Sequence, residues 1–312
     1  MHAVHSLFTE PVNLNRWPTV DSFFRAFALS AVLAERHMGA IELVTDSYGA
    51  ELLAEAMRLP YRRVSTTLNA MHGRYHPEFW TLGKIAAYAE QTKPFVHIDG
   101  DWFMLKPLSP EVLNAPIAYQ SKEAAPAHSP GVYKIALYER LGMAIPPSWR
   151  WCLASTGANQ YAANMGLYAC RNLILNRAYC REAFAFVDAQ ANQPVFERMV
   201  RERVGAELWE VSVSVEQFTA VSVARKAGVN PAYVVPEYWE PTWGGDPAFV
   251  HLFWKYKGMA HHEAEVARRL HALAPEYIAR AEHAAKTFER MVAAGRFNGR
   301  PAQQFGFAGH GY

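Results

Sequence analysis

FVHIDGDWF, residues 95–103, is the most informative segment of this sequence for its architecture. Its first four residues form an apolar run that follows Pro94, and this pattern predicts a buried strand. Asp99 and Asp101 come next, two positions apart, so both carboxylates point to the same side of an extended chain. Gly100 between them allows the backbone to turn or to approach a ligand closely. The stretch therefore predicts a strand that ends at a pair of acidic side chains.

The segments before this stretch alternate between short apolar runs and helix-period patterns. Strands are predicted around residues 3–8 and 41–46, each followed by a helix, and a third helix is predicted from Pro77 to about Gln91. This order is typical of a mostly parallel sheet covered by helices, whose ligands bind beyond the carboxyl ends of the strands. The acidic pair is expected at such an end.

The segments after the acidic pair predict further strands and a helical end. The strands are expected at residues 115–120, 163–170, 207–213, 232–236 and 248–254. The stretch from Lys122 to Thr156 contains Pro, Ser and Gly and is expected to be a long loop, and loops of that length are usually functional. A helical region is predicted from about His262 to Ala294, interrupted at Pro275. The aperiodic residues after it predict a loose tail, with a mobile cover over the site as the less favoured alternative.

The composition is that of a globular protein. The 312 residues are 51% hydrophobic, which is enough for a substantial core. A net charge of +2 is too small to indicate a nucleic-acid-binding surface, so no nucleic acid is expected as a partner. The three cysteines lack CxxC spacing and indicate neither a disulfide framework nor a zinc site. With neither a signal-peptide pattern nor a long apolar run, the sequence predicts a cytoplasmic protein without a transmembrane segment.

The acidic pair has the chemistry of a divalent-metal site. Mg²⁺ and Mn²⁺ prefer carboxylate oxygens and often share their coordination shell with substrate phosphates. Two Asp residues at a strand end therefore suit a nucleotide diphosphate. Asp-Gly-Asp is also a good turn sequence, and on its own it is more often a turn than a metal site. The neighbouring segments change this balance.

HIDGDWFMLKPL, residues 97–108, resembles the DxD segment of metal-dependent glycosyltransferases of the GT-A fold, which use nucleotide-diphospho-sugars. Three further landmarks follow in family order: an Asn-x-Gly segment that contacts the donor sugar, an acidic residue with Gln before a helix, and a closing His and Lys. They correspond to Asn164-Met165-Gly166, to Glu216-Gln217, and to His251 with Lys257. Met165 stands where a small residue is commoner, and Glu216 replaces Asp. The resemblance covers roughly residues 1–258.

The resemblance implies an organisation and a set of ligands. It implies a GT-A-like α/β domain over residues 1–260 with a mostly parallel central sheet covered by helices, then a C-terminal helical extension over 261–294 and a flexible tail over 295–312. The implied cofactor is a divalent metal, Mn²⁺ or Mg²⁺. The implied donor substrate is a nucleotide-diphospho-sugar, and the acceptor is a sugar, a lipid-linked glycoconjugate or a protein. Peripheral contact of the C-terminal helix with an anionic membrane is a minor hypothesis.

The resemblance also assigns roles to single residues. Asp99, Asp101 and His251 are the implied metal ligands, and Asp99 could instead contact the donor ribose or a metal-bound water. Lys257 would lie on the diphosphate, where its charge offsets the negative charge that grows as the glycosidic bond breaks. Asp101, Glu216 and Lys257 are then the implied catalytic residues. The implied donor-binding residues are Asp46, Lys84, Asp99, Asn164, Gly166 and Lys257.

Several of these assignments have competing interpretations. A lone His in the apolar run around His251 more often fills a core, Gly166 can mark a strand bulge, and Glu216 can be a carboxylate at a helix N-terminus. Lys255 competes with Lys257 for the diphosphate. The base of an inverting reaction could be Glu216 or Asp188, whereas a retaining reaction needs no dedicated base, and the sequence does not choose between the two outcomes.

Two other function classes are open at this point. Haloacid-dehalogenase-type phosphatases also have a DxD at a strand end, but near the start of the domain and followed by Thr or Val. Here about a hundred residues precede the pair, and Trp102 and Phe103 follow it. The third class is a non-catalytic carbohydrate-binding relative, against which the intact set of acidic residues, His and Lys argues.

Overall fold

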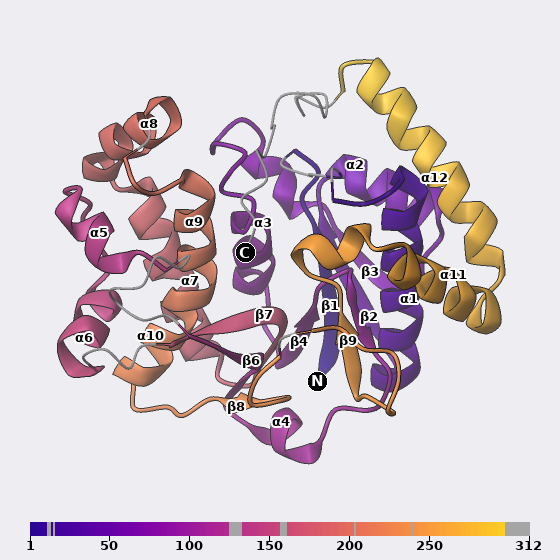
Figure 1. Cartoon of the computed structure of the whole chain (residues 1–312), viewed down its shortest axis with the longest axis horizontal. Coiled ribbons are helices and arrows are strands. Elements are labelled where there is room, and N and C mark those ends of the chain that lie inside the picture. The colour runs from indigo at the N-terminus through magenta and orange to yellow at the C-terminus, as the bar shows by residue number, and fades with distance from the viewer. Residues whose placement is uncertain are drawn as a thin grey trace.

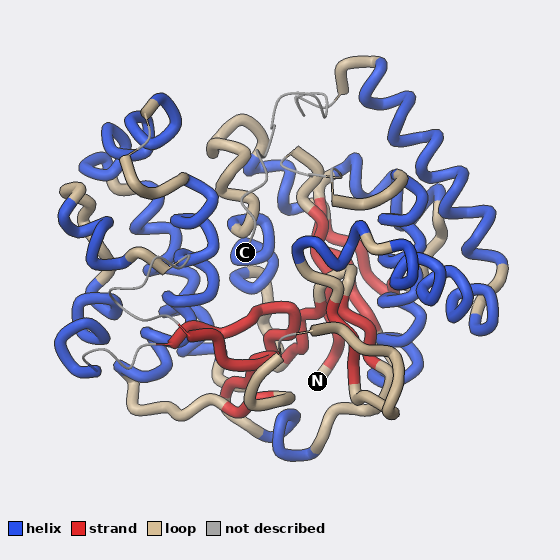
Figure 2. Tube along the Cα trace, in the orientation of Figure 1, coloured by secondary structure: helices blue, strands red, loops and turns tan. Residues whose placement is uncertain are grey.

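The structure is a computed structural model. It describes residues 1–10, 14, 16–124, 133–156, 161–202, 204–238 and 240–296. A sheet of seven strands runs through the centre of the molecule, and helices lie on both sides of it (Figures 1 and 2). The strand order is β3-β2-β1-β4-β7-β6-β8. The predicted α/β fold with a mostly parallel, helix-covered sheet is therefore confirmed.

The strands of the main sheet are β1 (His2–Leu7), β2 (Ile41–Thr45), β3 (Tyr61–Ser65), β4 (Phe95–Ile98), β6 (Ile117–Ala124), β7 (Tyr161–Cys170) and β8 (Ala232–Tyr233). The first four are parallel, β7 is antiparallel to both of its neighbours, and β6 is parallel to β8. A separate ribbon pairs β5 (Trp102–Met104) with β9 (Phe249–His251). The sequence did not predict β3, because this edge strand is mostly exposed and lacks an apolar alternation.

One face of the sheet is covered by α1 (Val20–Met38), α11 (Ala260–Leu273) and α12 (Glu276–Ala293). Thr19 caps the start of α1, and Gly39 ends it with a φ of 75°. The two C-terminal helices pack on α1, where Arg25 forms an ion pair of 2.9 Å with Glu263. Pro275 separates the two helices, so the predicted helical region with an interruption at this residue is confirmed.

The remaining helical segments lie mainly on the other face and around the site. They are α2 (Ser47–Gly49), η1 (Ala50–Ala56), η2 (Thr67–Met71), α3 (Leu82–Ala89), α4 (Pro110–Asn114), α5 (Ile135–Arg140), α6 (Pro147–Thr156), α7 (Leu173–Asp188), η3 (Gln190–Asn192), α8 (Gln193–Arg201), α9 (Leu208–Val213), η4 (Ser214–Phe218), α10 (Thr219–Lys226) and η5 (Trp254–Gly258). Neighbouring strand residues face opposite cores: Ala3 belongs to the core that contains the buried face of α1, and Val4 belongs to the core that contains those of α3 and α7.

Two sequence predictions were wrong about secondary structure. Residues 207–213, predicted as a strand, form α9, which continues through the π-helix η4 into α10. The window of residues 207–213 fits an alternating strand pattern, but over the longer run into η4 and α10 the apolar residues recur at helical spacing. Glu207 and Glu210 form a capping box at the start of this helix. The expected loop of residues 122–156 contains α5, α6 and the end of β6, while residues 125–132 lie outside the described part.

Other predictions hold in a changed form or stay untested. The strand expected at 232–236 is only the two residues of β8, and the one at 248–254 is β9, which pairs with β5. The division at residue 260 remains a prediction, although α11 and α12 share a core with α1. Most of the predicted tail, residues 297–312, lies outside the described residues. None of the described helices is long and apolar enough to span a membrane.

Candidate functional site

The acidic pair lies on the turn between β4 and β5. The backbone N–H of Asp99 donates to the carbonyl of Gly166 at 2.9 Å, and that of Trp102 donates to the carbonyl of Asp99 at 2.9 Å. Gly100 lies against α1, and a Cβ at this position would stand 2.3 Å from the ring of Phe27. Gly100 is therefore required for close approach to a helix, and the turn that carries both carboxylates is held from two sides.

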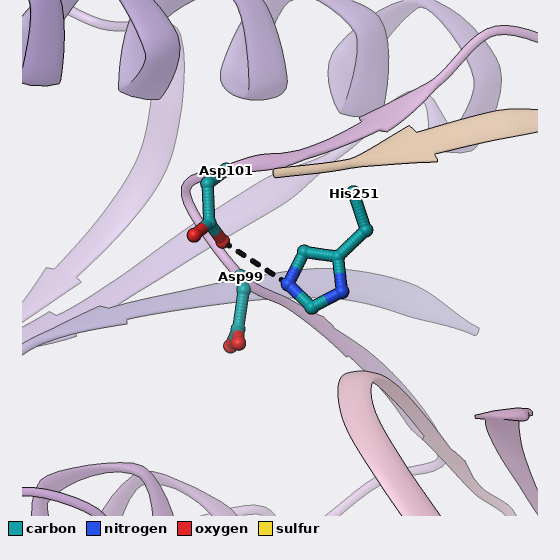
Figure 3. Close-up of side chains that lie close together, drawn as sticks. All are labelled: Asp99, Asp101 and His251. Atoms are coloured by element: carbon teal, nitrogen blue, oxygen red, sulfur yellow. Dashed lines mark ion pairs between the residues drawn. The ribbon is translucent and has the colours of Figure 1, made fainter. Parts of the chain in front are cut away.

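The ribbon of β5 and β9 brings His251 to the acidic pair. Trp102 lies opposite His251 in the antiparallel register, and the backbone N–H of Leu252 donates to the carbonyl of Asp101 at 3.0 Å. Figure 3 shows the side chains of Asp99, Asp101 and His251 gathered at one place. One ligand atom of each lies within 4.8 Å of the others. The imidazole Nε2 of His251 is 3.5 Å from a carboxylate oxygen of Asp101. The three predicted metal ligands are thus brought together.

This donor set fits a divalent metal. Two carboxylates and one imidazole suit Mn²⁺, and three protein ligands leave positions for water or phosphate oxygens. Asp101 and His251 are buried, and Asp99 is partly exposed. The second ring nitrogen of His251, Nδ1, is buried and has no hydrogen-bond partner among the described residues. The site is therefore a small, enclosed group of acceptors open on the side of Asp99.

Lys257 neutralises Asp101. Its ammonium is 2.6 Å from a carboxylate oxygen of Asp101, on the short segment η5. Burial acts to raise the pKa of Asp101, but Lys257 and His251 outweigh it and hold that pKa below its usual value. The same segment contains Trp254, which has a φ of 50°, an unusual conformation for a bulky residue. A strained, short segment therefore carries the cation of the site.

Lys84 neutralises the other carboxylate of the pair. It extends from α3, and its ammonium is 3.0 Å from each oxygen of Asp99, 2.5 Å from Glu216 and 3.2 Å from the carbonyl of Met165. Burial lowers the pKa of Lys84, but the two carboxylates raise it more, so the lysine is charged. Burial, with the charge of Asp99, raises the pKa of Glu216 to about 7 despite Lys84. One cation is thus shared by two carboxylates.

Strand β7 supplies Asn164 and Gly166. The register with β6 shifts here, because Tyr119 pairs with Tyr168 whereas Ser121 pairs with Asn164. The side-chain oxygen of Asn164 accepts from the backbone N–H of Gly166 at 3.0 Å, and its amide donates to Glu123 at 2.7 Å. The irregular strand therefore turns backbone groups toward the site.

Sequence reasoning missed Glu123. This partly buried residue of β6 accepts hydrogen bonds from Asn164 and from the hydroxyl of Tyr133, and Tyr133 also contacts Gln217. It thereby connects the Asn-x-Gly segment with the Glu-Gln pair. No motif surrounds Glu123 in the sequence, and its position follows only from the pairing of β6 with β7.

Two predicted site residues have other partners. Asp46 is fully buried at the end of β2, where it caps α2 through the N–H of Gly49 and accepts from the backbone and hydroxyl of Thr9. Asp188 ends α7 and forms an exposed ion pair of 3.0 Å with Arg74. No contact among the described residues joins either carboxylate to the acidic pair. Their predicted roles stay predictions.

Three comparisons relate the chain to known proteins. A model described as "Family of unknown function (DUF6734)" matches residues 1–283. No curated protein sequence matches the chain. Among solved structures, the chain is similar to mouse xyloside xylosyltransferase 1 in its apo form, with 12% sequence identity and a TM-score of 0.31, over 70% of this chain and 82% of that chain.

Proposed function

The chain belongs to the DUF6734 family, a family of unknown function, and we propose from the geometry of its site that it is a metal-dependent glycosyltransferase with a nucleotide-diphospho-sugar as donor. The observation that carries the proposal is the meeting of Asp99, Asp101 and His251 at the carboxyl end of a parallel strand, beside Lys257. Ligands bind at such strand ends in open α/β sheets. A nucleotide diphosphate is the ligand class whose charge suits a divalent metal flanked by lysines.

Different residues of the site would bind the metal and contact the diphosphate. A bound Mn²⁺ or Mg²⁺ would supply Lewis-acid stabilisation of the diphosphate leaving group. Asp99, Asp101 and His251 would hold the ion, and Lys257 would leave Asp101 to contact the phosphates. Its cationic charge then favours the state in which the glycosidic bond to phosphate has broken. Burial raises the pKa of Asp99, and Lys84 opposes this rise while holding the carboxylate in place through two contacts of 3.0 Å.

Two carboxylates next to the acidic pair and the Asn-x-Gly segment are candidates for a role toward the acceptor. Glu216 is fully buried, and one of its oxygens contacts Lys84 at 2.5 Å. Glu123 is partly exposed and is held by Asn164 at 2.7 Å. A base must come within hydrogen-bond reach of the acceptor hydroxyl, so Glu123 is the better placed of the two for an inverting reaction. A retaining reaction would use Glu123 and Asn164 only to bind sugar hydroxyl groups.

The test is binding and turnover with a panel of UDP-, GDP- and CDP-sugars, with and without Mn²⁺. A sugar nucleotide that binds the folded protein raises its melting temperature by mass action. We expect one donor class to stabilise the wild type only with Mn²⁺ and to release nucleoside diphosphate. Asp101→Asn removes a metal-ligand charge and should lose this response, with turnover reduced on the order of 100-fold or more.

The matched control is Asp246→Asn, since Asp246 is an exposed partner of Lys106 outside the site. It should keep the metal-dependent response of the wild type. If no sugar nucleotide binds with Mn²⁺, or if Asp101→Asn responds like the wild type, the proposal is wrong. Hydrolysis of a phosphate ester in the same assay would instead support the phosphatase alternative.

A further inference from the structure

Gln120 is a fully buried polar side chain whose hydrogen-bonding capacity is unused. It lies on β6 where the register with β7 shifts, and it faces the site. Neither its amide nitrogen nor its carbonyl oxygen has a hydrogen-bond partner among the described residues. Unsatisfied polar atoms in the interior destabilise a protein, because the hydrogen bonds that they make to water in the unfolded chain are not replaced. Such a residue calls for an explanation other than packing.

His251, which lies near Gln120, also has a buried polar atom without a hydrogen-bond partner in the described part of the chain. Its Nε2 faces Asp101 at 3.5 Å, while its Nδ1 is buried without a partner among the described residues. The rings of Tyr238 and Phe253 stack or tilt against the imidazole and offer Nδ1 no strong acceptor. The nitrogen that would not bind the metal therefore lacks the acceptor that metal-binding histidines usually have.

Gly166 lies next to both the Gln120 side chain and the imidazole of His251. A Cβ at this residue would lie 2.4 Å from the carbonyl oxygen of Gln120 and 2.7 Å from Nδ1 of His251. Both atoms therefore stand close to the same point, over a residue that has no side chain. Because both atoms lie so close to this one point, a modest movement of either side chain would bring them within hydrogen-bond distance. The backbone of Gly166 is itself held by Asp99 and Asn164.

We propose that Gln120 is the positioning residue of His251, with its side-chain carbonyl accepting a hydrogen bond from Nδ1–H when Nε2 binds the metal. This inference rests on the proposed metal site. The hydrogen bond would fix the tautomer of the ring, orient Nε2 toward Asp101 and make it a better ligand. Gln120 does not contact the metal or the substrate, so its effect is felt through His251 alone. It also accounts for the glycine at position 166.

The proposal predicts opposite effects on stability and on metal binding. Gln120→Leu removes two unsatisfied polar atoms from the core, so the melting temperature without metal should stay equal or rise. Loss of the acceptor should weaken Mn²⁺ binding about 10- to 100-fold. Gln120→Glu keeps an acceptor oxygen in the same place and should bind Mn²⁺ within a few-fold of the wild type. The measurement is calorimetric titration with Mn²⁺ alone, beside thermal unfolding of the metal-free proteins.

A buried glutamine elsewhere provides the matched control. Gln91 is 4% exposed and hydrogen-bonds to the carbonyl of Ala87 and to His2. Gln91→Leu should lower the melting temperature and leave Mn²⁺ affinity unchanged, the reverse of the pattern for Gln120→Leu. Mn²⁺ affinity of Gln120→Leu equal to that of the wild type would overturn the inference while leaving the metal site intact. Equal losses in the Leu and Glu variants would also overturn it, and a wild type that binds no Mn²⁺ would overturn the metal site as well.

Discussion

The two carboxylates of the acidic pair lie two residues apart and have different surroundings. Asp99 faces α3 and η4, where Lys84 also holds the buried Glu216, and its pKa is raised chiefly by burial. Asp101 faces η5, where Lys257 and His251 hold its pKa below the usual value against the effect of burial. On the first side a cation is locked between helices, and on the second it comes from a short surface segment.

This difference separates the framework of the site from its adjustable part. Lys84 has only 13% of its side chain exposed and four oxygen contacts, so it has no freedom to leave Asp99. Lys257 has 25% exposed and contacts Asp101 with a single ion pair. We therefore expect the Lys84 side to respond to substitution as a stability element and the Lys257 side as a ligand-binding element.

The largest expected effect is on the Lys84 side. Lys84→Met leaves Asp99 and Glu216 without the cation they share, and should lower the free energy of unfolding by about 3 kcal/mol or more. Urea denaturation measures this loss. The control Lys106→Met breaks an exposed pair with Asp246 and should cost less than about 1 kcal/mol. Adding Glu216→Gln to Lys84→Met should recover part of the loss, and a double variant less stable than the single one would contradict the shared-cation picture.

The next effect is a pH dependence of stability that Glu216→Gln removes. The pKa of Glu216 is raised by burial from 4.5 to about 7 in the folded protein. Between these values the folded state binds more protons than the unfolded state, so this group lowers stability as pH rises from about 4.5 to 7. Relative to the wild type, Glu216→Gln should gain up to about 1.4 kcal/mol per pH unit in this window. Urea unfolding at pH 5 and pH 7.5 measures it, and parallel pH profiles would count against it.

The smallest expected effect concerns Lys257, whose replacement should strengthen the binding of Mn²⁺ and weaken the binding of UDP. The ion pair with Asp101 must open for a metal to bind, so Lys257→Met should bind Mn²⁺ alone about fivefold more tightly, a difference of about 1 kcal/mol. With Mn²⁺ present, the same variant should bind UDP more weakly, because the phosphates lose a cation. Calorimetry resolves both steps. The control Lys255→Met, on the same segment, should leave the affinities for Mn²⁺ and for UDP unchanged. Weaker binding of Mn²⁺ alone by Lys257→Met would show that Lys257 and the metal do not compete for Asp101.

Local patterns predicted the parts of the molecule that local forces build. The apolar run before Asp99 predicted β4 because a buried strand needs continuous hydrophobicity, and Pro275 marked the break between α11 and α12 because proline cannot continue a helix. The strand assigned to residues 207–213 was wrong because a short window of mixed residues fits two periods. The longer helical spacing and the contacts of α9 with the core decided between them.

Within the site, the residue pattern predicted an acidic pair at a strand end, and the resemblance to GT-A glycosyltransferases added the Asn-x-Gly segment and the closing His and Lys as candidates. The folded chain was needed to see that the β5–β9 ribbon sets His251 beside Asp101, and that Gly166 leaves room for the imidazole. The structure alone also placed Glu123 and Gln120 at the site. These relations depend on pairing between segments far apart in the chain. Side-chain period and turn chemistry act over a few residues, so they do not encode which distant strand becomes a neighbour.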